Sequence, residues 1–210
     1  MDSYLEEIVW KRMERVAKAL EKNNIKSYCV KTRQEVVPLL KDLIPLNATV
    51  AAGGSVSLDE CGVLEFLRKG DYQFWDRYAP DVDREEIQRR SFSADCYLAS
   101  ANAITEAGEI FNVDGNGNRI AAIAYGPSSV ILVVGSNKLV RDLNEAQNRL
   151  ETVAAPANAN RLLRKTPCVS TGKCENCHSP ERICCTYMVQ RFQRNAGRIK
   201  VILVQEPLGY

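Results

Sequence analysis

Short apolar runs alternate with longer amphipathic segments along the chain, and this alternation restricts the possible folds more than any other feature. The most apolar run, residues 130–134, reads Val-Ile-Leu-Val-Val, which is typical of a central strand buried on both faces. Further strands are predicted at residues 26–31, 48–52, 72–75, 94–100 and 200–205. Because helical segments separate these strands, the pattern favours an α/β fold with a mostly parallel sheet between layers of helices.

Helices are predicted where apolar residues recur every three or four positions. The clearest helix covers residues 3–22, where Ser3 and Glu6 have the spacing of a capping box. The other predicted helices cover residues 34–43, 58–69, 83–91, 142–150 and 158–165. In the middle of the chain, the turn sequence 114–118 (Asp-Gly-Asn-Gly-Asn) predicts an inserted β-hairpin between strands at residues 109–113 and 119–124.

Length and composition indicate one folded domain. The chain has 210 residues, of which 45% are hydrophobic and 26% are charged, so it can bury an ordinary core. We expect a single domain over residues 1–210, with residues 166–186 as a cysteine-rich appendage within it. No apolar run approaches the roughly 18–20 residues that a bilayer requires, and no signal-peptide core is apparent. We therefore expect a cytoplasmic protein without a membrane anchor.

Five of the eight cysteines lie within a short segment and are the strongest chemical signal in the sequence. They are Cys168, Cys174, Cys177, Cys184 and Cys185. A CxxC pair lets two thiolates reach one metal, and a four-thiolate set of Cys168, Cys174, Cys177 and Cys184 would suit zinc or an iron–sulfur cluster. The spacing does not separate these two metals, and Cys185 could replace Cys184. Free thiols are the alternative. Cys174–His178 also matches the c-type haem pattern, but haem attachment takes place outside the cytoplasm.

A glycine turn follows the predicted strand at residues 48–52 and leads into a helix. Backbone N–H groups near Gly53, Gly54 and Ser55, together with Ser57, are predicted to hold an anion such as a phosphate or a carboxylate. The alternative is purely local, because Ser57 and Glu60 have capping-box spacing.

Polar residues also follow two other predicted strands. Glu106 is the candidate catalytic carboxylate, since ligands of open α/β sheets bind beyond the carboxyl ends of strands. The alternative role for Glu106 is to cap backbone groups or to form an ion pair with Arg119. The remaining predicted ligand-binding residues, near the same edge, are Asn102, Asn112, Asp114 and Lys138.

Several segments together resemble the LUD family of lactate-utilisation proteins, particularly its small stand-alone members. They are residues 53–62 (GGSVSLDECG), 94–140, 155–168 (APANANRLLRKTPC) and 201–210 (VILVQEPLGY). The resemblance implies a Rossmann-like three-layer α/β/α fold, similar to the ribose-5-phosphate isomerase, glucosamine-6-phosphate deaminase and CoA-transferase group. It also implies a role in oxidising lactate to pyruvate beside iron–sulfur partner subunits. Phosphate or CoA would bind at Gly53–Ser55, and Glu106 would match the CoA-transferase nucleophile. The chain lacks the ferredoxin pattern C-x2-C-x2-C-x3-C-P of the cluster-bearing members.

Two functions follow from these features. The first is a protein of lactate or related organic-acid utilisation that binds an anionic small molecule and carries a cysteine-ligated metal; whether it is an enzyme stays open. The second is a non-catalytic metal-binding regulatory or assembly module. Residues 161–200 hold nine Lys or Arg and two Asp or Glu, so such a module could bind nucleic acid, although the interleaved aromatic residues of single-strand binders are few. A homodimer is the default expectation for such folds.

Overall fold

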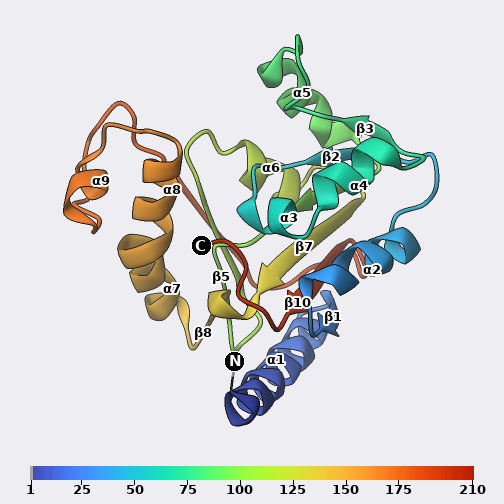
Figure 1. Ribbon diagram of the computed structural model, residues 1–210, viewed down its shortest axis with the longest axis horizontal. Coiled ribbons are helices and arrows are strands. Elements are labelled where there is room, and N and C mark those ends of the chain that lie inside the picture. Colours follow the sequence, from blue (N-terminus) through green and yellow to red (C-terminus); the bar gives the residue numbers. More distant parts are fainter. Residues whose placement is uncertain (1) are drawn as a thin grey trace.

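The largest element of the fold is a six-stranded sheet in which every pair of neighbouring strands is parallel (Figure 1). The structure, a computed structural model, describes residues 2–210. In spatial order the strands are β1 (Lys26–Val30), β10 (Ile199–Val204), β7 (Ser129–Gly135), β4 (Cys96–Ala99), β2 (Thr49–Ala52) and β3 (Gln73–Trp75). The prediction that residues 130–134 form a central strand is confirmed, because β7 lies between β10 and β4.

Helices cover both faces of this sheet and produce three layers. On one face, α1 (Ser3–Lys22) and α6 (Asn118–Ala124) pack against Val130, Leu132 and Val134 of β7. On the other face, α2 (Val36–Leu43), α3 (Val56–Glu60) and α4 (Val63–Lys69) pack against Ile131 and Val133. Successive strand residues thus enter two different cores, which explains why the strand is apolar throughout. The Rossmann-like α/β/α prediction is confirmed.

A smaller four-stranded sheet is formed by strands that lie between β4 and β10 in the sequence. Its order is β8 (Leu139–Val140), β5 (Ala103–Thr105), β6 (Ile110–Asp114) and β9 (Thr186–Gln190). A third core joins this sheet to α7 (Leu143–Arg149), a π-helical turn (Leu150–Ala154) and α8 (Ala155–Arg161). Figure 1 shows α7, α8 and the short α9 (Pro167–Thr171) gathered at one end of the molecule. The helix α5 (Arg84–Arg90) follows β3.

The inserted hairpin is present, and its predicted strand at residues 109–113 is confirmed as β6, but the partner strand and the turn between them are other residues than the sequence predicts. Its strands are β5 and β6, which pair antiparallel through Ala103–Phe111 and Ile104–Ile110. Residues 119–124 are not a strand, because they form most of α6. Three of these six residues are alanine, the strongest helix former, and Ile120 and Ile123 are buried at a helical spacing.

Two predicted helix caps are also wrong, although the helix predicted at residues 3–22 is confirmed as α1. The helix predicted at residues 58–69 is divided at Cys61-Gly62 into α3 and α4, and α3 begins at Val56 with Ser55 as its N-cap. Ser57 is therefore inside the helix and is fully buried, so it does not form the capping box with Glu60. At α1, the cap is Asp2 instead of Ser3, since the Asp2 carboxylate accepts a hydrogen bond from the Tyr4 backbone N–H at 3.0 Å.

Within residues 2–210, no helix combines the length and the apolar character that crossing a bilayer demands. The cysteine-rich segment, residues 166–186, runs from the end of α8 through α9 to β9. The chain then returns to the main sheet as β10, between β1 and β7, as the sequence predicts.

Candidate functional site: an arginine-lined cavity at the strand ends

The carboxyl ends of β2 and β4 mark the switch point of the main sheet. After β2 the chain moves outward to the edge strand β3, whereas after β4 it moves through the small sheet toward β7 in the centre. The two connections leave in opposite directions, so a crevice remains between their starting points, where ligands of open α/β sheets bind. The residues at these points are Gly53–Ser55 after β2 and Ser100–Asn102 after β4.

A cavity of about 580 Å³ lies at this switch point. The main sheet contributes one part of its wall, through the loops after β2 and β4. The opposite part comes from α8 and from residues 180–183 of the cysteine-rich segment. Among residues 2–210, the charged side chains in its lining are Arg77, Arg84, Arg119, Lys138, Arg161, Arg164, Arg182, Asp114 and Glu181. Seven cationic side chains thus face two carboxylates, which favours an anionic occupant.

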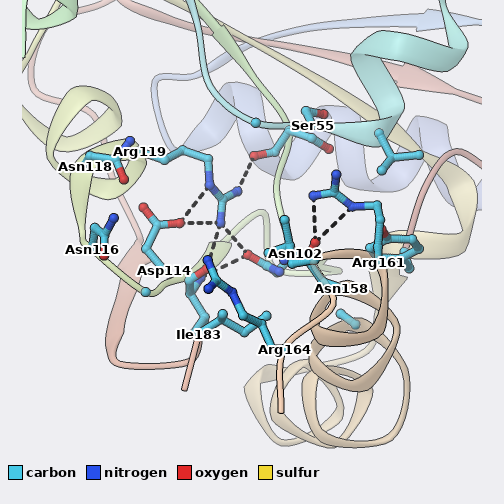
Figure 2. A pocket seen from close by; sticks show the side chains of 18 of the residues that line it. Ser55, Asn102, Asp114, Asn116, Asn118, Arg119, Asn158, Arg161, Arg164 and Ile183 are labelled. Atoms are coloured by element: carbon cyan, nitrogen blue, oxygen red, sulfur yellow. Dashed lines mark hydrogen bonds and ion pairs between the residues drawn. The ribbon is translucent and has the colours of Figure 1, made fainter. Parts of the chain in front are cut away.

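Arg119 of α6 is the most strongly bonded of these cations (Figure 2). Its Nε donates to Asp114 Oδ1 at 2.9 Å, and its Nη1 donates to Asn112 Oδ1 at 2.7 Å and to the Ser100 carbonyl at 3.0 Å. Its Nη2 donates to Asn102 Oδ1 at 2.9 Å and to the Val113 carbonyl at 2.8 Å. All five N–H groups of this guanidinium are therefore used. Arg119 fixes the loops around the cavity, and Asp114 offsets its charge.

Other cations of the lining lack a carboxylate partner. Within residues 2–210, Arg77, Arg84, Arg161 and Arg164 form no ion pair. Arg161 donates through Nε and Nη2 to the neutral Asn158 Oδ1. Figure 2 shows Arg161 and Arg164 reaching in from the C-terminal end of α8. These arginines are positioned to pair with an anion that enters the cavity.

Two buried polar atoms in the lining also lack a partner. They are Arg77 Nε and Tyr210 Oη, and the third such atom in the described chain is Asn112 Nδ2 directly behind Arg119. A buried donor without a partner costs roughly 1–3 kcal/mol. The two in the lining therefore indicate that a polar ligand or water completes the site.

Lys138 lies at the inner end of the cavity, in a 3-10 turn (Ser136–Lys138) directly after β7. Its side chain is only 3% exposed, and its Nζ lies 2.9 Å from Ser57 Oγ and 3.1 Å from Ser100 Oγ. Burial, helped by the positive charges of Arg149 and Arg119 and opposed by Glu60, lowers the pKa of Lys138 from 10.5 to about 7. The described residues hold no carboxylate within ion-pair distance of this amine.

The structure brings together most of the ligand-binding residues that the sequence predicts. Those in the cavity lining are Gly54, Ser55, Asn102, Asp114 and Lys138. Asn112 and Ser57 lie one contact behind it, bonded to Arg119 and Lys138 respectively. Gly53 also lies behind it, because a Cβ there would come within 2.7 Å of Tyr97 Oη and 3.3 Å of the Arg119 side chain. Gly53 thus permits close packing of β2 against Tyr97 and Arg119.

Glu106, the predicted catalytic carboxylate, lies elsewhere. It follows β5 in the small sheet and is not part of the cavity lining. Its Oε1 accepts a hydrogen bond from Arg12 Nε of α1 at 2.9 Å, and its side chain is 37% exposed. The alternative ion pair with Arg119 is not formed either, since Arg119 pairs with Asp114. This placement is typical of a carboxylate that fastens α1 to the small sheet.

Within the cysteine-rich segment, Cys174 and Cys177 lie close enough to Cys184 to influence its pKa. Charge on Cys174 and Cys177 contributes to the raised pKa of Cys184, although burial is the larger cause and Arg182 opposes both. The backbone N–H of Asn176 donates to Cys174 Sγ at 3.4 Å. Cys168 and Cys185 have other partners, which are Thr166 Oγ1 at 3.3 Å and the Arg182 carbonyl at 3.4 Å. Within residues 2–210, no three His, Cys, Asp or Glu side chains are arranged as a metal site.

The sequence analysis missed the arginines of the cavity and Ser100. Arg161, Arg164 and Arg182 belong to the basic stretch 161–200, whose excess charge is visible in the sequence. The sequence did not reveal that part of this charge faces the strand ends of a distant sheet. Ser100 could have been found, because it is the polar last residue of the strand predicted at residues 94–100.

One comparison with known proteins shows a family, and a second shows a similar fold. The family model described as LUD domain matches residues 13–204. A crystal structure of a DUF162 family protein from Deinococcus radiodurans is similar over 93% of this chain and 98% of that chain, with a TM-score of 0.51. At 14% sequence identity this likeness supports the fold alone. No curated protein matches the sequence.

Proposed function

Because the chain belongs to the LUD-domain family, we propose that it acts in the utilisation of lactate or a related small organic acid, by binding an anionic small molecule in the arginine-lined cavity. The family suggests the metabolic setting, and the cavity suggests how the molecule is held.

One observation carries this proposal. The cavity lining contains Arg77, Arg84, Arg161 and Arg164 without ion-pair partners in the described chain, together with two unpartnered buried atoms, Arg77 Nε and Tyr210 Oη. Uncompensated cations repel one another and destabilise the folded state unless an anion or solvent offsets them. A carboxylate or phosphate would accept hydrogen bonds from guanidinium groups and gain charge-assisted pairs.

The position of the cavity also fits this proposal. It lies at the carboxyl ends of β2 and β4, where the fold leaves a crevice without any specialised insertion. Arg161, Arg164 and Arg182, three of the nine basic residues in the stretch 161–200, line the cavity. Part of the basic charge of this stretch would then serve to bind a small anion. We therefore prefer a small-molecule-binding protein to a nucleic-acid-binding module.

The test is ligand-induced stabilisation of the purified chain. Lactate, pyruvate, ribose 5-phosphate, CoA and inorganic phosphate are each titrated at constant ionic strength while the melting temperature is followed. A ligand of the cavity at a hundred times its Kd should stabilise the fold by about 2.7 kcal/mol.

A pair of matched variants assigns the stabilisation to the cavity. Arg164→Gln removes an exposed, unpaired cavity arginine, and Arg194→Gln removes an equally exposed, unpaired arginine outside it. We expect Arg164→Gln to weaken binding about tenfold, since a charge-assisted pair contributes roughly 1.5 kcal/mol, and Arg194→Gln to have no effect. Absence of a shift with every anion, or equal losses in the two variants, would contradict the proposal.

We further propose that Cys174, Cys177 and Cys184 bind one soft metal centre, either zinc or an iron–sulfur cluster. The donor set suits such a metal, Cys174 and Cys177 lie close enough to Cys184 to influence its pKa, and the N–H···S bond to Cys174 is one that would stabilise a thiolate. Binding would require the side chains to turn toward a common centre, and Cys168 would have to leave Thr166 to serve as a fourth ligand. An iron–sulfur centre would be consistent with the iron–sulfur partner subunits that the family resemblance implies.

Metal analysis of protein purified without oxygen tests this second proposal. Cys177→Ser should reduce the metal content to background, whereas Cys185→Ser should retain it, because Cys185 is exposed and bonded to the Arg182 carbonyl. Absorbance near roughly 400 nm would identify an iron–sulfur cluster, and a colourless protein with about one zinc per chain would identify zinc. A Cys177→Ser protein with full metal content would disprove this assignment.

A further inference from the structure

Lys138 is a buried amine that anion binding alone does not explain. Most buried lysines are paired with a carboxylate, because an unpaired buried ammonium is strongly disfavoured. The described neighbours of Lys138 Nζ are instead two hydroxyls, Ser57 Oγ at 2.9 Å and Ser100 Oγ at 3.1 Å. The nearby charges that act on Lys138 most strongly are positive, from Arg149 and Arg119.

The bonding of this nitrogen leaves one position open. A lysine nitrogen has three positions besides its bond to Cε, and Ser57 and Ser100 occupy two of them. The third has no partner among the described residues, and Lys138 is part of the cavity lining. Because the pKa of Lys138 is about 7, the amine is unprotonated and carries a lone pair in a large fraction of the molecules at neutral pH. Desolvation and neighbouring cations are the two means by which proteins make lysine nucleophilic.

We propose that the ε-amine of Lys138 forms an imine with the carbonyl carbon of a small anionic carbonyl compound held by the arginines of the cavity. The substrate class is therefore a 2-oxo carboxylate or a phosphorylated aldehyde or ketone. This inference deepens the proposed function and rests on it, since the arginines must first bind the anionic group.

The step is balanced without any oxidant or reductant. Lys138 Nζ attacks the carbonyl carbon, an N–C bond forms, and the electron pair of the C=O bond moves to oxygen. A proton passes from nitrogen to that oxygen, giving a carbinolamine. Ser100 is placed to relay it, because its Oγ is 3.1 Å from Nζ and Ser100 lines the cavity. A second proton transfer lets the C–O bond break, water leaves, and the C=N bond forms.

Reductive trapping tests the imine directly. The full chain is incubated with pyruvate, or in a second arm with dihydroxyacetone phosphate, in the presence of cyanoborohydride. The intact mass and the proteolytic peptides are then measured. We expect one reduced adduct per chain, located on the peptide that contains Lys138. The arm that reacts faster identifies the carboxylate or the phosphate class.

Lys200 provides a control within the same molecule. It is also partly buried and bonded to a serine, with Nζ 3.0 Å from Ser129 Oγ, and burial lowers its pKa as well, but it does not line the cavity. We expect no adduct at Lys200. Lys138→Met, with a similar apolar stem, should abolish trapping, and circular dichroism checks that this variant is folded. Ser100→Ala keeps the amine and should slow trapping about a hundredfold or more, the usual contribution of general acid–base catalysis.

The outcomes separate this inference from the proposed function. Stabilisation by pyruvate or by dihydroxyacetone phosphate without an adduct of that compound on Lys138 would overturn the imine and leave the anion-binding function intact. Adducts spread evenly over exposed lysines, or on Lys200 as often as on Lys138, would also overturn it. If neither stabilisation nor trapping occurs with any probe, both proposals fail.

Discussion

At the scale of single residues, Lys138 should make the stability of the fold depend on pH. Its pKa is about 7 in the folded chain and 10.5 for an ordinary lysine, so between these values the unfolded chain binds more protons than the folded one. Stability therefore rises with pH across this window, by about 1.4 kcal/mol per pH unit at most. Below pH 7 both states carry the charged lysine, and the destabilising effect of its burial is fully present.

Urea unfolding of the wild type and of Lys138→Met, from about pH 6 to about pH 9, measures this effect. The stability of the wild type relative to the variant should increase above pH 7, because only the wild type loses a buried charge there. Lys69→Met is the control, since Lys69 is exposed and paired with Glu65 on the same helix. A stability difference between wild type and Lys138→Met that does not change over this range would show that Lys138 titrates like an ordinary lysine.

Single residues also show which roles a sequence can reveal. Asn102, Asp114 and Lys138 were found as polar residues near strand ends, and the structure places all three in one cavity. Ser57 is predicted to hold an anion, with helix capping as the alternative, but its hydroxyl contacts Lys138 and the Leu208 carbonyl in the interior. Glu106 looked equally suitable in the sequence, but it lies against Arg12. The sequence shows which polar residues lie near strand ends, but it does not show which residues they contact in the folded chain.

At the scale of elements, the contact between α1 and the β5–β6 turn depends on Gly108. Gly108 has φ +76°, and a Cβ there would lie 2.7 Å from Ala19 C and from Leu20 N of the α1 backbone. Asn23, at the end of α1, donates its Nδ2 to the carbonyls of Ala107 and Gly108. A backbone atom cannot move aside as a flexible side chain can, so the helix or the turn would have to shift.

Gly108→Ala should therefore destabilise the fold by about 2–4 kcal/mol, from overpacking plus the positive φ. Gly197→Ala is the matched control, because Gly197 has φ +75° and a Cβ there would meet nothing within 4 Å. It should cost about 1 kcal/mol from φ alone. Urea unfolding at one pH gives both values, and similar losses in the two variants would mean that α1 and the turn are not in close contact.

The errors at this scale have a common cause. The turn sequence at residues 114–118 favours a strand at residues 119–124, yet their alanine-rich helical propensity and the burial of Ile120 and Ile123 produce the helix α6. The strand β9 was not predicted, since its residues 186–190 are mostly exposed and gain their order by pairing with β6. Strands that depend on a distant partner leave little trace in local hydrophobicity.

At the scale of the whole molecule, the cavity joins parts of the chain that are far apart in sequence. One wall is the strand-end edge of the main sheet, and the opposite wall includes residues 180–183 of the cysteine-rich segment. Arg182 joins two parts of this segment, since its Nη1 donates to the Cys177 carbonyl at 2.7 Å and its Nε donates to the Cys184 carbonyl at 2.9 Å. The same side chain is part of the cavity lining. Order among the cysteines is therefore linked to the shape of the anion site.

The sequence by itself determined the layered α/β fold, because strands buried on both faces must be apolar throughout and helices must carry one apolar stripe. It also determined which short segments hold polar residues at strand ends, since those follow directly from the strand positions. Only the tertiary structure decided that Arg161, Arg164 and Arg182 face the ends of β2 and β4, and that Lys138 has two serines and no carboxylate beside it. Local patterns report burial and propensity, whereas the charge around a group is set by residues that only folding brings together.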